Sequence, residues 1–154
     1  PTLSAIKDDG STTETYAIRG EFVQNGFNQN TLRHEKGVIS MARSDYSQMG
    51  LYEEGYNSAG SQFFIMTGDN ASLNGYYAAF GKVIEGMDVL DKLNETEVTT
   101  SEDSSDSEAS TPVNPPVIKS VRVDTFGVDY GAPETVTPFD YNSYIQQLYG
   151  GMSN

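Results

Sequence analysis

The usual catalytic and metal-binding arrangements of side chains are mostly missing from this 154-residue chain. The chain has no cysteine and a single histidine, His34, which excludes thiolate sites and multi-histidine metal sites. A serine triad would have to use His34, which lies just before an apolar run. We interpret His34 instead as a hydrogen-bonded turn residue. No glycine-rich phosphate loop and no spacing typical of metal ligands is present, so we expect neither a metal nor a cofactor.

The charge of the chain excludes one class of partner. Nine basic and 22 acidic side chains give a net charge of −13. Binding to DNA or RNA needs a cationic surface, so we expect no nucleic-acid partner. An acidic, Ser/Thr-rich chain without cysteine is compatible with a bacterial cell surface or secretion and also with the cytoplasm. We prefer the first location only slightly.

Short strands and tight turns predominate among the elements that must position a site. Residues 16–22 alternate weakly between apolar and polar side chains, and residues 37–42 and 62–67 form mostly apolar runs. Residues 78–83 leave a tight turn at 74–75. These four runs predict strands.

The remaining segments predict helices, loops and one insert. Residues 45–60 are rich in Tyr, Gly, Ser and Asn, which indicates a loop. Apolar residues three apart predict a short helix at 88–93, and an i, i+3, i+4 pattern predicts an amphipathic helix at 140–150. Residues 97–114 are acidic and Ser/Thr-rich and predict a disordered insert. Alternating valines predict a strand at 117–123.

One ordered set of motifs is much more specific than any of its members. Its blocks are Gly37-Val-Ile-Ser-Met-Ala-Arg43, Ser58-Ala-Gly-Ser-Gln-Phe-Phe-Ile65, Leu73-Asn-Gly75, Phe80-Gly-Lys-Val83 and Glu85-Gly-Met-Asp-Val89. Gly20-Glu-Phe22, Leu32-Arg-His34 and Pro116-Val-Ile118 agree with the same set. In this order and at these spacings, the blocks resemble the cyclophilin-type peptidyl-prolyl cis-trans isomerases.

The resemblance implies a mainly β fold, a closed eight-stranded antiparallel barrel capped by helices. The cyclophilin-like domain is expected at 1–125, interrupted by the acidic insert and followed by a tail at 126–154. The family's phenylalanine-histidine-arginine stretch and its Gln-Gly-Gly-Asp would lie just upstream of Pro1. We therefore expect the chain to lack the first two strands, the first helix and the catalytic arginine of the family. The chain's arginines, none of which matches that position, are Arg19, Arg33, Arg43 and Arg122.

The resemblance also implies a site that binds a proline-containing peptide on the outer face of the barrel. Phe64 and Leu73 correspond to walls of the proline pocket. Gln62 corresponds to a side chain that bonds the substrate backbone, since an amide both donates and accepts hydrogen bonds. Tyr77 stands where many members carry a histidine, and its hydroxyl could donate to a substrate carbonyl.

The edge of the implied groove departs from the family pattern. Ala42, Arg43 and Ser44 correspond to its floor and edge, beside the residues that precede the proline. The family often has an asparagine where Arg43 stands. Ser72 stands where many members carry a tryptophan that contacts cyclosporin, so we expect weak cyclosporin binding.

We interpret the parent protein as a cofactor-free peptidyl-prolyl isomerase that acts on proline-containing peptides and unfolded proteins. The chain itself is expected to be poorly active, and the edge of its incomplete barrel could associate with other chains. An alternative is a binding module that captures proline peptides without catalysis. A third is a structural interaction domain whose partner surface is the acidic insert or the tyrosine-rich tail.

Overall fold

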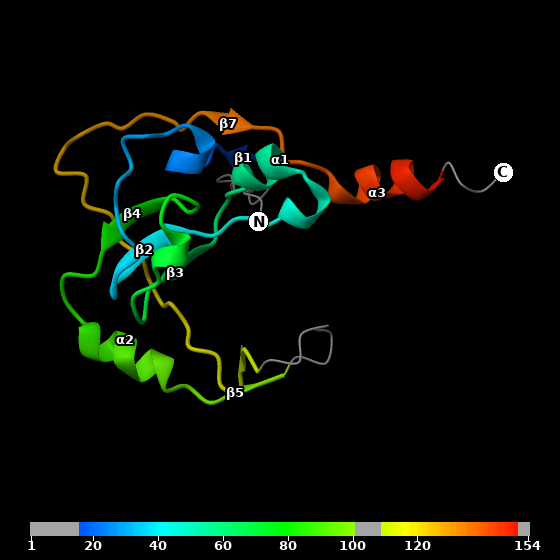
Figure 1. Cartoon of the computed structure of the whole chain (residues 1–154). Helices are drawn as coiled ribbons and strands as arrows, with labels where there is room; N and C mark the ends of the chain where they lie inside the picture. Colours follow the sequence, from blue (N-terminus) through cyan, green and yellow to red (C-terminus); the bar gives the residue numbers. More distant parts are fainter. Residues whose placement is uncertain (1–15, 101–108, 151–154) are drawn as a thin grey trace, which may run out of the picture. The chain divides into compact units, whose positions relative to one another are not determined.

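The computed structural model describes residues 16–100 and 109–150 and divides into two parts (Figure 1). The first part runs to Gly81 and resumes at Pro133, and the second runs from Lys82 to Ala132. The described residues contain seven strands and three α-helices. No helix in these residues is long and apolar enough to cross a membrane.

A three-stranded sheet lies at the centre of the first part. Strand β2 (Val38–Met41) lies between β3 (Phe63–Ile65) and β4 (Ala79–Lys82). The antiparallel pairing of β2 with β3 sets Ile39 opposite Ile65. These three strands confirm the strands predicted at 37–42, 62–67 and 78–83. Apolar and β-branched side chains favour strands in such runs.

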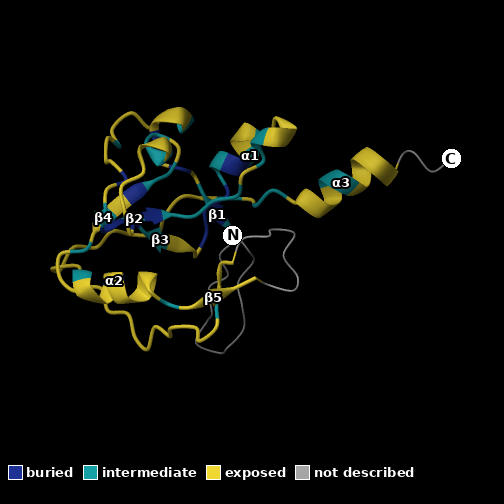
Figure 2. Ribbon diagram, turned by 60° about the horizontal axis from the view of Figure 1, so that its bottom comes forward, coloured by how far each residue is buried: buried dark blue, intermediate teal, exposed yellow. Residues whose placement is uncertain are grey.

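The core of this part lies on one face of the sheet. Val38, Met66 and Ala79 are buried together, and Phe64 and Leu73 are partly buried against them. Figure 2 shows the buried residues gathered around β1, β2 and β4, whereas α2 and α3 are largely exposed. The two residues predicted to wall the proline pocket therefore pack directly on the core.

A second sheet brings the end of the chain into the first part. Strand β1 (Ala17–Ile18) pairs antiparallel with β7 (Thr135–Val136), and Ile18 also forms a bridge with Ala59. Helix α3 (Tyr141–Gly150) follows β7, in the segment for which an amphipathic helix is predicted. The predicted boundary between a domain at 1–125 and a tail at 126–154 stays a prediction, although residues 135–136 already pair with β1.

The segment 45–60 was predicted as a loop, and this was wrong in part. It contains a 3-10 helix, η2 (Ser47–Met49), and a short α-helix, α1 (Tyr52–Tyr56). Glu53 and Glu54 lie in the first turn of α1, where negative charge favours a helix. Two further 3-10 helices are η1 (Val23–Asn25), which precedes β2, and η3 (Ala71–Leu73), which lies between β3 and β4 in the sequence.

The second part contains one helix and one short pair of strands. Helix α2 (Met87–Asn94) confirms the helix predicted at 88–93, and it buries Leu90. Strand β5 (Val98–Thr99) pairs antiparallel with β6 (Thr111–Pro112). These strands bring together the ends of the predicted insert at 97–114. Residues 101–108 lie outside the described residues, so the predicted disorder there stays a prediction.

The strand predicted at 117–123 does not form. Val117, Val121 and Val123 are all strongly exposed, and this segment has no strand assignment. A strand needs a neighbour whose backbone N–H and C=O groups complete its ladder, and no described segment pairs with this one.

The strands of the described residues form three separate small sheets, not one closed eight-stranded barrel. These sheets have the orders β1-β7, β3-β2-β4 and β5-β6. The predicted strand-rich architecture with helices is therefore present, but the strands of these residues do not close into a barrel.

Candidate functional site

His34 lies under the candidate site in a closed hydrogen-bond network. It is 2% exposed, and its Nε2 lies 3.0 Å from Ser40 Oγ while its Nδ1 lies 3.2 Å from Asn74 Oδ1. Asn74 Oδ1 also accepts from the backbone N–H of His34 at 2.8 Å. Because an amide oxygen only accepts, Nδ1 donates to Asn74 Oδ1, and in the corresponding neutral tautomer Nε2 accepts from the serine hydroxyl. Both ring nitrogens are used, so His34 is the hydrogen-bonded residue expected from the sequence.

Three predicted pocket residues come together above this network. The Phe64 and Tyr77 rings meet edge to face, with centroids 5.7 Å apart and planes at 83°. His34 stacks on Phe64 at 6.1 Å and meets Tyr77 edge to face at 6.4 Å. Leu73 and Phe64 both pack on the buried core. Contacts with the buried core and with the His34 ring thus hold these side chains in place before any ligand arrives.

The turn around η3 positions Leu73 and Tyr77. Asn70 caps η3 and accepts from the backbone N–H and from the hydroxyl of Ser72, at 3.0 and 2.6 Å. The carbonyl of Leu73 accepts from the N–H groups of Tyr76 and Tyr77. Gly75 adopts a φ of +77°, which a side chain rarely tolerates. Ser72 is exposed, and its hydroxyl and backbone N–H both hydrogen-bond to Asn70 in the same turn.

Ala42 and Gln62 lie side by side where β2 ends and β3 begins. The N–H of Ala42 donates to the carbonyl of Gln62 at 3.0 Å. The Gln62 residue is exposed and Ala42 is half-buried. The amide of Gln62 is therefore accessible to a ligand at the sheet's end.

Arg43 makes more contacts than its predicted place at the groove edge suggests. Its guanidinium carbon lies 4.6 Å from the ring centre of Tyr77, 5.2 Å from that of Tyr56 and 5.7 Å from that of Phe22. Its Nε donates to the carbonyl of Tyr76 at 2.9 Å, and its Nη1 donates to the carbonyl of Ser44. Arg43 thus fastens the segment containing α1 to the turn that carries Tyr77.

Ser44 completes the same edge through its backbone. Its N–H donates to Ser58 Oγ at 2.8 Å, and the Ser58 hydroxyl donates to the carbonyl of Gly55 at 2.7 Å. A Cβ on Gly55 would lie 3.0 Å from the Ser44 carbonyl oxygen, so this close approach favours glycine.

A cavity of about 280 Å³ adjoins these residues. Its walls include three of the predicted site residues, Arg43, Ser72 and Tyr77. We call it the tyrosine groove, because its other walls include Tyr46, Tyr52, Tyr56 and Tyr76. These four tyrosines were not predicted as site residues. The available signal for three of them, Tyr46, Tyr52 and Tyr56, was the concentration of tyrosine in 45–60, which was interpreted as a loop.

A comparison with protein families gives this geometry a context. The model of the family "Cyclophilin type peptidyl-prolyl cis-trans isomerase/CLD" matches residues 3–123, most of the chain. The chain belongs to the cyclophilin family. The resemblance seen in the sequence motifs is thereby confirmed.

Named relatives of this cyclophilin are peptidyl-prolyl isomerases. A "Probable peptidyl-prolyl cis-trans isomerase" of Brucella abortus (strain 2308) is 47% identical over 58 residues, 38% of this chain and 25% of that protein. The "Peptidyl-prolyl cis-trans isomerase-like 3" of Dictyostelium discoideum is 38% identical over 93 residues, 60% of this chain and 47% of that protein. The "Peptidyl-prolyl cis-trans isomerase CYP18-1" of Arabidopsis thaliana is 41% identical over 70 residues, 45% of this chain and 38% of that protein. The chain therefore spans less than half the length of these relatives.

The cyclophilin site carries one perturbed carboxylate. The pKa of Asp45, in the wall of the tyrosine groove, is lowered by hydrogen bonds from the backbone and side chain of Ser47, with a smaller contribution from Arg43. The backbone N–H of Ser47 donates to Asp45 Oδ1 at 3.0 Å. The groove therefore contains one cation and one anion at neutral pH.

Proton transfer and metal chemistry have no evident centre in this part of the cyclophilin. His34 is sequestered, and no group of three His, Asp or Glu side chains in residues 16–100 and 109–150 could hold a metal ion. What the arrangement offers is a cluster of apolar side chains, Phe64 and Leu73, with an exposed amide and a phenol near it. Such a site can bind and orient a peptide.

Proposed function

We propose that this cyclophilin binds X–Pro segments of peptides and unfolded proteins and promotes their cis-trans isomerisation without a cofactor. The carrying observation is the Phe64–Leu73–Tyr77 cluster, which lies beside the exposed Gln62 in a chain of this family. The reaction is rotation about an amide with a barrier of about 18–20 kcal/mol, due to C–N double-bond character. A site that holds the twisted amide better than either planar form accelerates it without a nucleophile.

The proposed roles follow the shapes and polarities of these residues. Phe64 and Leu73 hold the proline ring through apolar contact. Gln62 donates to and accepts from the substrate backbone, and the Tyr77 hydroxyl donates to a substrate carbonyl. Ala42, Arg43 and Ser44 border the residues that precede the proline, with Ser72 at the rim.

Catalysis by residues 1–154 alone is proposed to be slow. None of the chain's four arginines stands where the family has the arginine that hydrogen-bonds the prolyl nitrogen. Arg43 is occupied by the carbonyls of Tyr76 and Ser44 and by three rings. Loss of one preorganised donor typically costs about 10²–10³ in rate.

The finer architecture and the other partners are proposed on the same basis. The antiparallel β2-β3 pair supports the family's eight-stranded barrel, of which β2, β3 and β4 would be neighbouring strands. Cyclosporin binding is proposed to be weak, because the exposed Ser72 offers little apolar area. A location on the bacterial surface or outside the cell is proposed on composition alone.

The test combines binding with exchange on the same sample. A peptide with one X–Pro bond is titrated into residues 1–154, and its cis-trans exchange rate is measured by NMR. We expect saturable binding that Gln62→Ala weakens and that Gln24→Ala, an exposed glutamine in η1, does not. Absence of binding would overturn the proposal, and exchange as fast as in a complete cyclophilin would overturn the slow-catalysis claim.

The second candidate is a proline-peptide binding module without catalysis. The observation in its favour is that Arg43 is held in a structural role. The same titration distinguishes the two functions. Saturable binding with no measurable acceleration of exchange at any protein concentration would establish the module, whereas slow but measurable acceleration would support the isomerase.

A further inference from the structure

The tyrosine groove is continuous with the proposed proline site. Arg43, Ser72 and Tyr77 belong to both, and Tyr77 is the ring that meets Phe64 edge to face. A peptide whose proline lies against Phe64 would therefore pass the mouth of the groove. The groove lies on the side of Arg43, the side assigned to residues that precede the proline.

The walls of the groove are held in place by contacts within the first part of the structure. Tyr52 and Tyr56 lie one above the other on α1, with ring centroids 6.3 Å apart. Tyr46 stacks on Tyr141 at 5.6 Å with planes only 3° apart. Arg43 lies over the Tyr56 and Tyr77 rings. A groove with such walls needs little ordering on binding, and ordering is a main cost of affinity.

The charges of the groove favour an uncharged occupant. Arg43 and Asp45 line it together, so a cation or an anion would meet one attractive and one repulsive charge. The tyrosine rings of the walls instead suit an aromatic ring, which can stack on them or meet them edge to face. A cavity of about 280 Å³ has room for one such side chain.

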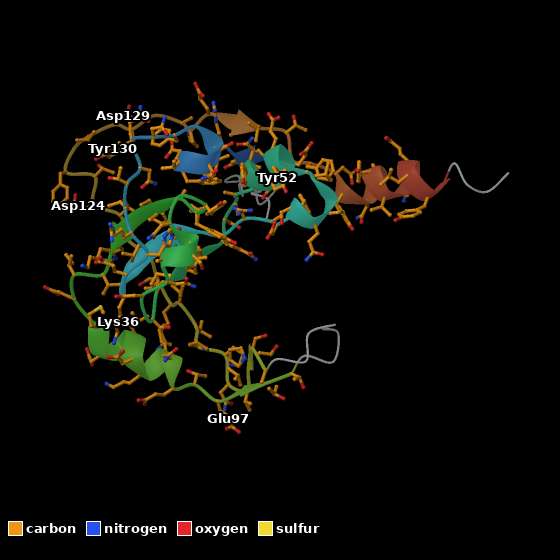
Figure 3. All side chains as sticks on the ribbon, viewed as in Figure 1. Lys36, Tyr52, Glu97, Asp124, Asp129 and Tyr130 are labelled. Atoms are coloured by element: carbon orange, nitrogen blue, oxygen red, sulfur yellow. The ribbon has the colours of Figure 1, made fainter. Side chains whose placement is uncertain are left out.

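We propose that the tyrosine groove is a specificity subsite for an aromatic side chain located within three residues before the proline of the bound peptide. This inference rests on the proposed function, because it presupposes that the proline itself is bound. The aromatic residue would pack against Tyr52 and Tyr56, which project from α1 beside the η2 segment (Figure 3 labels Tyr52). An aromatic contact of this kind corresponds to a preference of about tenfold.

The experiment uses peptides that differ at one position. A single-proline peptide of alanines is compared with peptides that carry Phe, Lys or Glu at one, two or three residues before the proline. We expect one Phe peptide to bind about tenfold more tightly than the alanine peptide, while the Lys and Glu peptides bind no better than alanine. Calorimetry on residues 1–154 gives the dissociation constants.

Two tyrosine variants locate the effect. Tyr52→Ala removes a wall whose residue is 54% exposed, so the fold should persist, and the Phe preference should disappear. Tyr149→Ala, an exposed tyrosine of α3 outside the groove, should leave the preference intact. Equal binding of Phe and alanine peptides, or a Phe preference that survives Tyr52→Ala, would overturn the subsite alone. Failure of every proline peptide to bind would overturn the proposed function and the subsite with it.

Discussion

Arg43 illustrates how one side chain connects a binding site with its surroundings. Its guanidinium lies over the rings of Phe22, Tyr56 and Tyr77, and its donors satisfy two backbone carbonyls. Each cation–π contact typically contributes about 0.5–1 kcal/mol when exposed and more when desolvated. An asparagine, common at this position in the family, could not reach three rings. The same residue that borders the proposed peptide site therefore stabilises the groove beside it.

His34 is expected to act on the site through the residues that it positions. His34→Ala removes the ring partner of the buried Ser40 hydroxyl and one of the two donors to Asn74 Oδ1, which typically costs about 1–3 kcal/mol of unfolding free energy. His34→Asn can still donate to Asn74 and should cost less. Thermal unfolding measures the stability, and titration with the single-proline peptide measures the affinity.

The affinity should fall in the same order as the stability, because Phe64 and Tyr77 both contact the His34 ring. Arg33→Ala, an exposed neighbour of His34, serves as the control. A variant that loses stability without any change in affinity would show that His34 supports only the core.

At the scale of elements, the sequence predicted those helices and strands that form because of their own local composition. The apolar runs of β2 and β3 and the three-residue spacing in α2 carry their own signal, and all three elements form. Helix α1 was missed because five residues are too few for a periodic pattern. Strand β7 was missed because its two residues depend on pairing with β1, which lies far away in the sequence.

The predicted site shows the same limit. The motif blocks identified Phe64, Leu73 and Tyr77, and the structure brings them together. They did not identify Tyr52 or Tyr56, because those residues reach the groove only through contacts with Arg43 and with each other. Residues far apart in sequence become one wall only when the chain has folded.

The chain's C-terminal segment is expected to brace the tyrosine groove. Tyr141 stacks on Tyr46 at 5.6 Å, and Phe139 meets Tyr46 at 5.5 Å. Aromatic pairs typically contribute about 0.5–1.5 kcal/mol beyond area burial. Tyr141→Ala should therefore speed amide exchange in η2 and α1 and weaken binding of the Phe peptide severalfold.

Tyr149→Ala is the matched control for Tyr141→Ala, since both lie on α3 and Tyr149 is 64% exposed. Amide-exchange protection of residues 45–56 that does not change in Tyr141→Ala would show that Tyr46 holds its place without the helix.

The N-terminus of α3 is stabilised by its own hydrogen bonds, because Ser143 donates to the Asp140 carboxylate and lowers its pKa. That stabilisation is present above the ordinary carboxyl pKa and is lost as the pH falls through the lowered value.

At the scale of the whole chain, unpaired strand edges and net charge act in opposite directions. Among the described residues, β3 and β4 are the outer strands of their sheet, and residues 117–123 expose alternating valines without a partner. The unpaired backbone groups of β3 and β4 favour pairing with another chain, and the exposed valines favour apolar association. A net charge of −13 repels a second copy, but at 0.1 M salt this repulsion is screened over about 10 Å.

We therefore expect residues 1–154 to associate reversibly at physiological salt and to become more monomeric as the salt concentration is lowered. Val121→Lys tests whether the exposed valines are responsible, because a charged side chain opposes apolar association. The same change makes the net charge less negative, so repulsion alone would predict more association, whereas loss of the apolar contact predicts less. Val128→Lys adds the same charge outside the alternating run and is the control. Sedimentation at several concentrations should show association of the parent chain and of Val128→Lys, and a monomer for Val121→Lys. A parent chain that sediments as a monomer at every salt concentration, or equal association of the two variants, would show that the exposed valines do not bring the chains together.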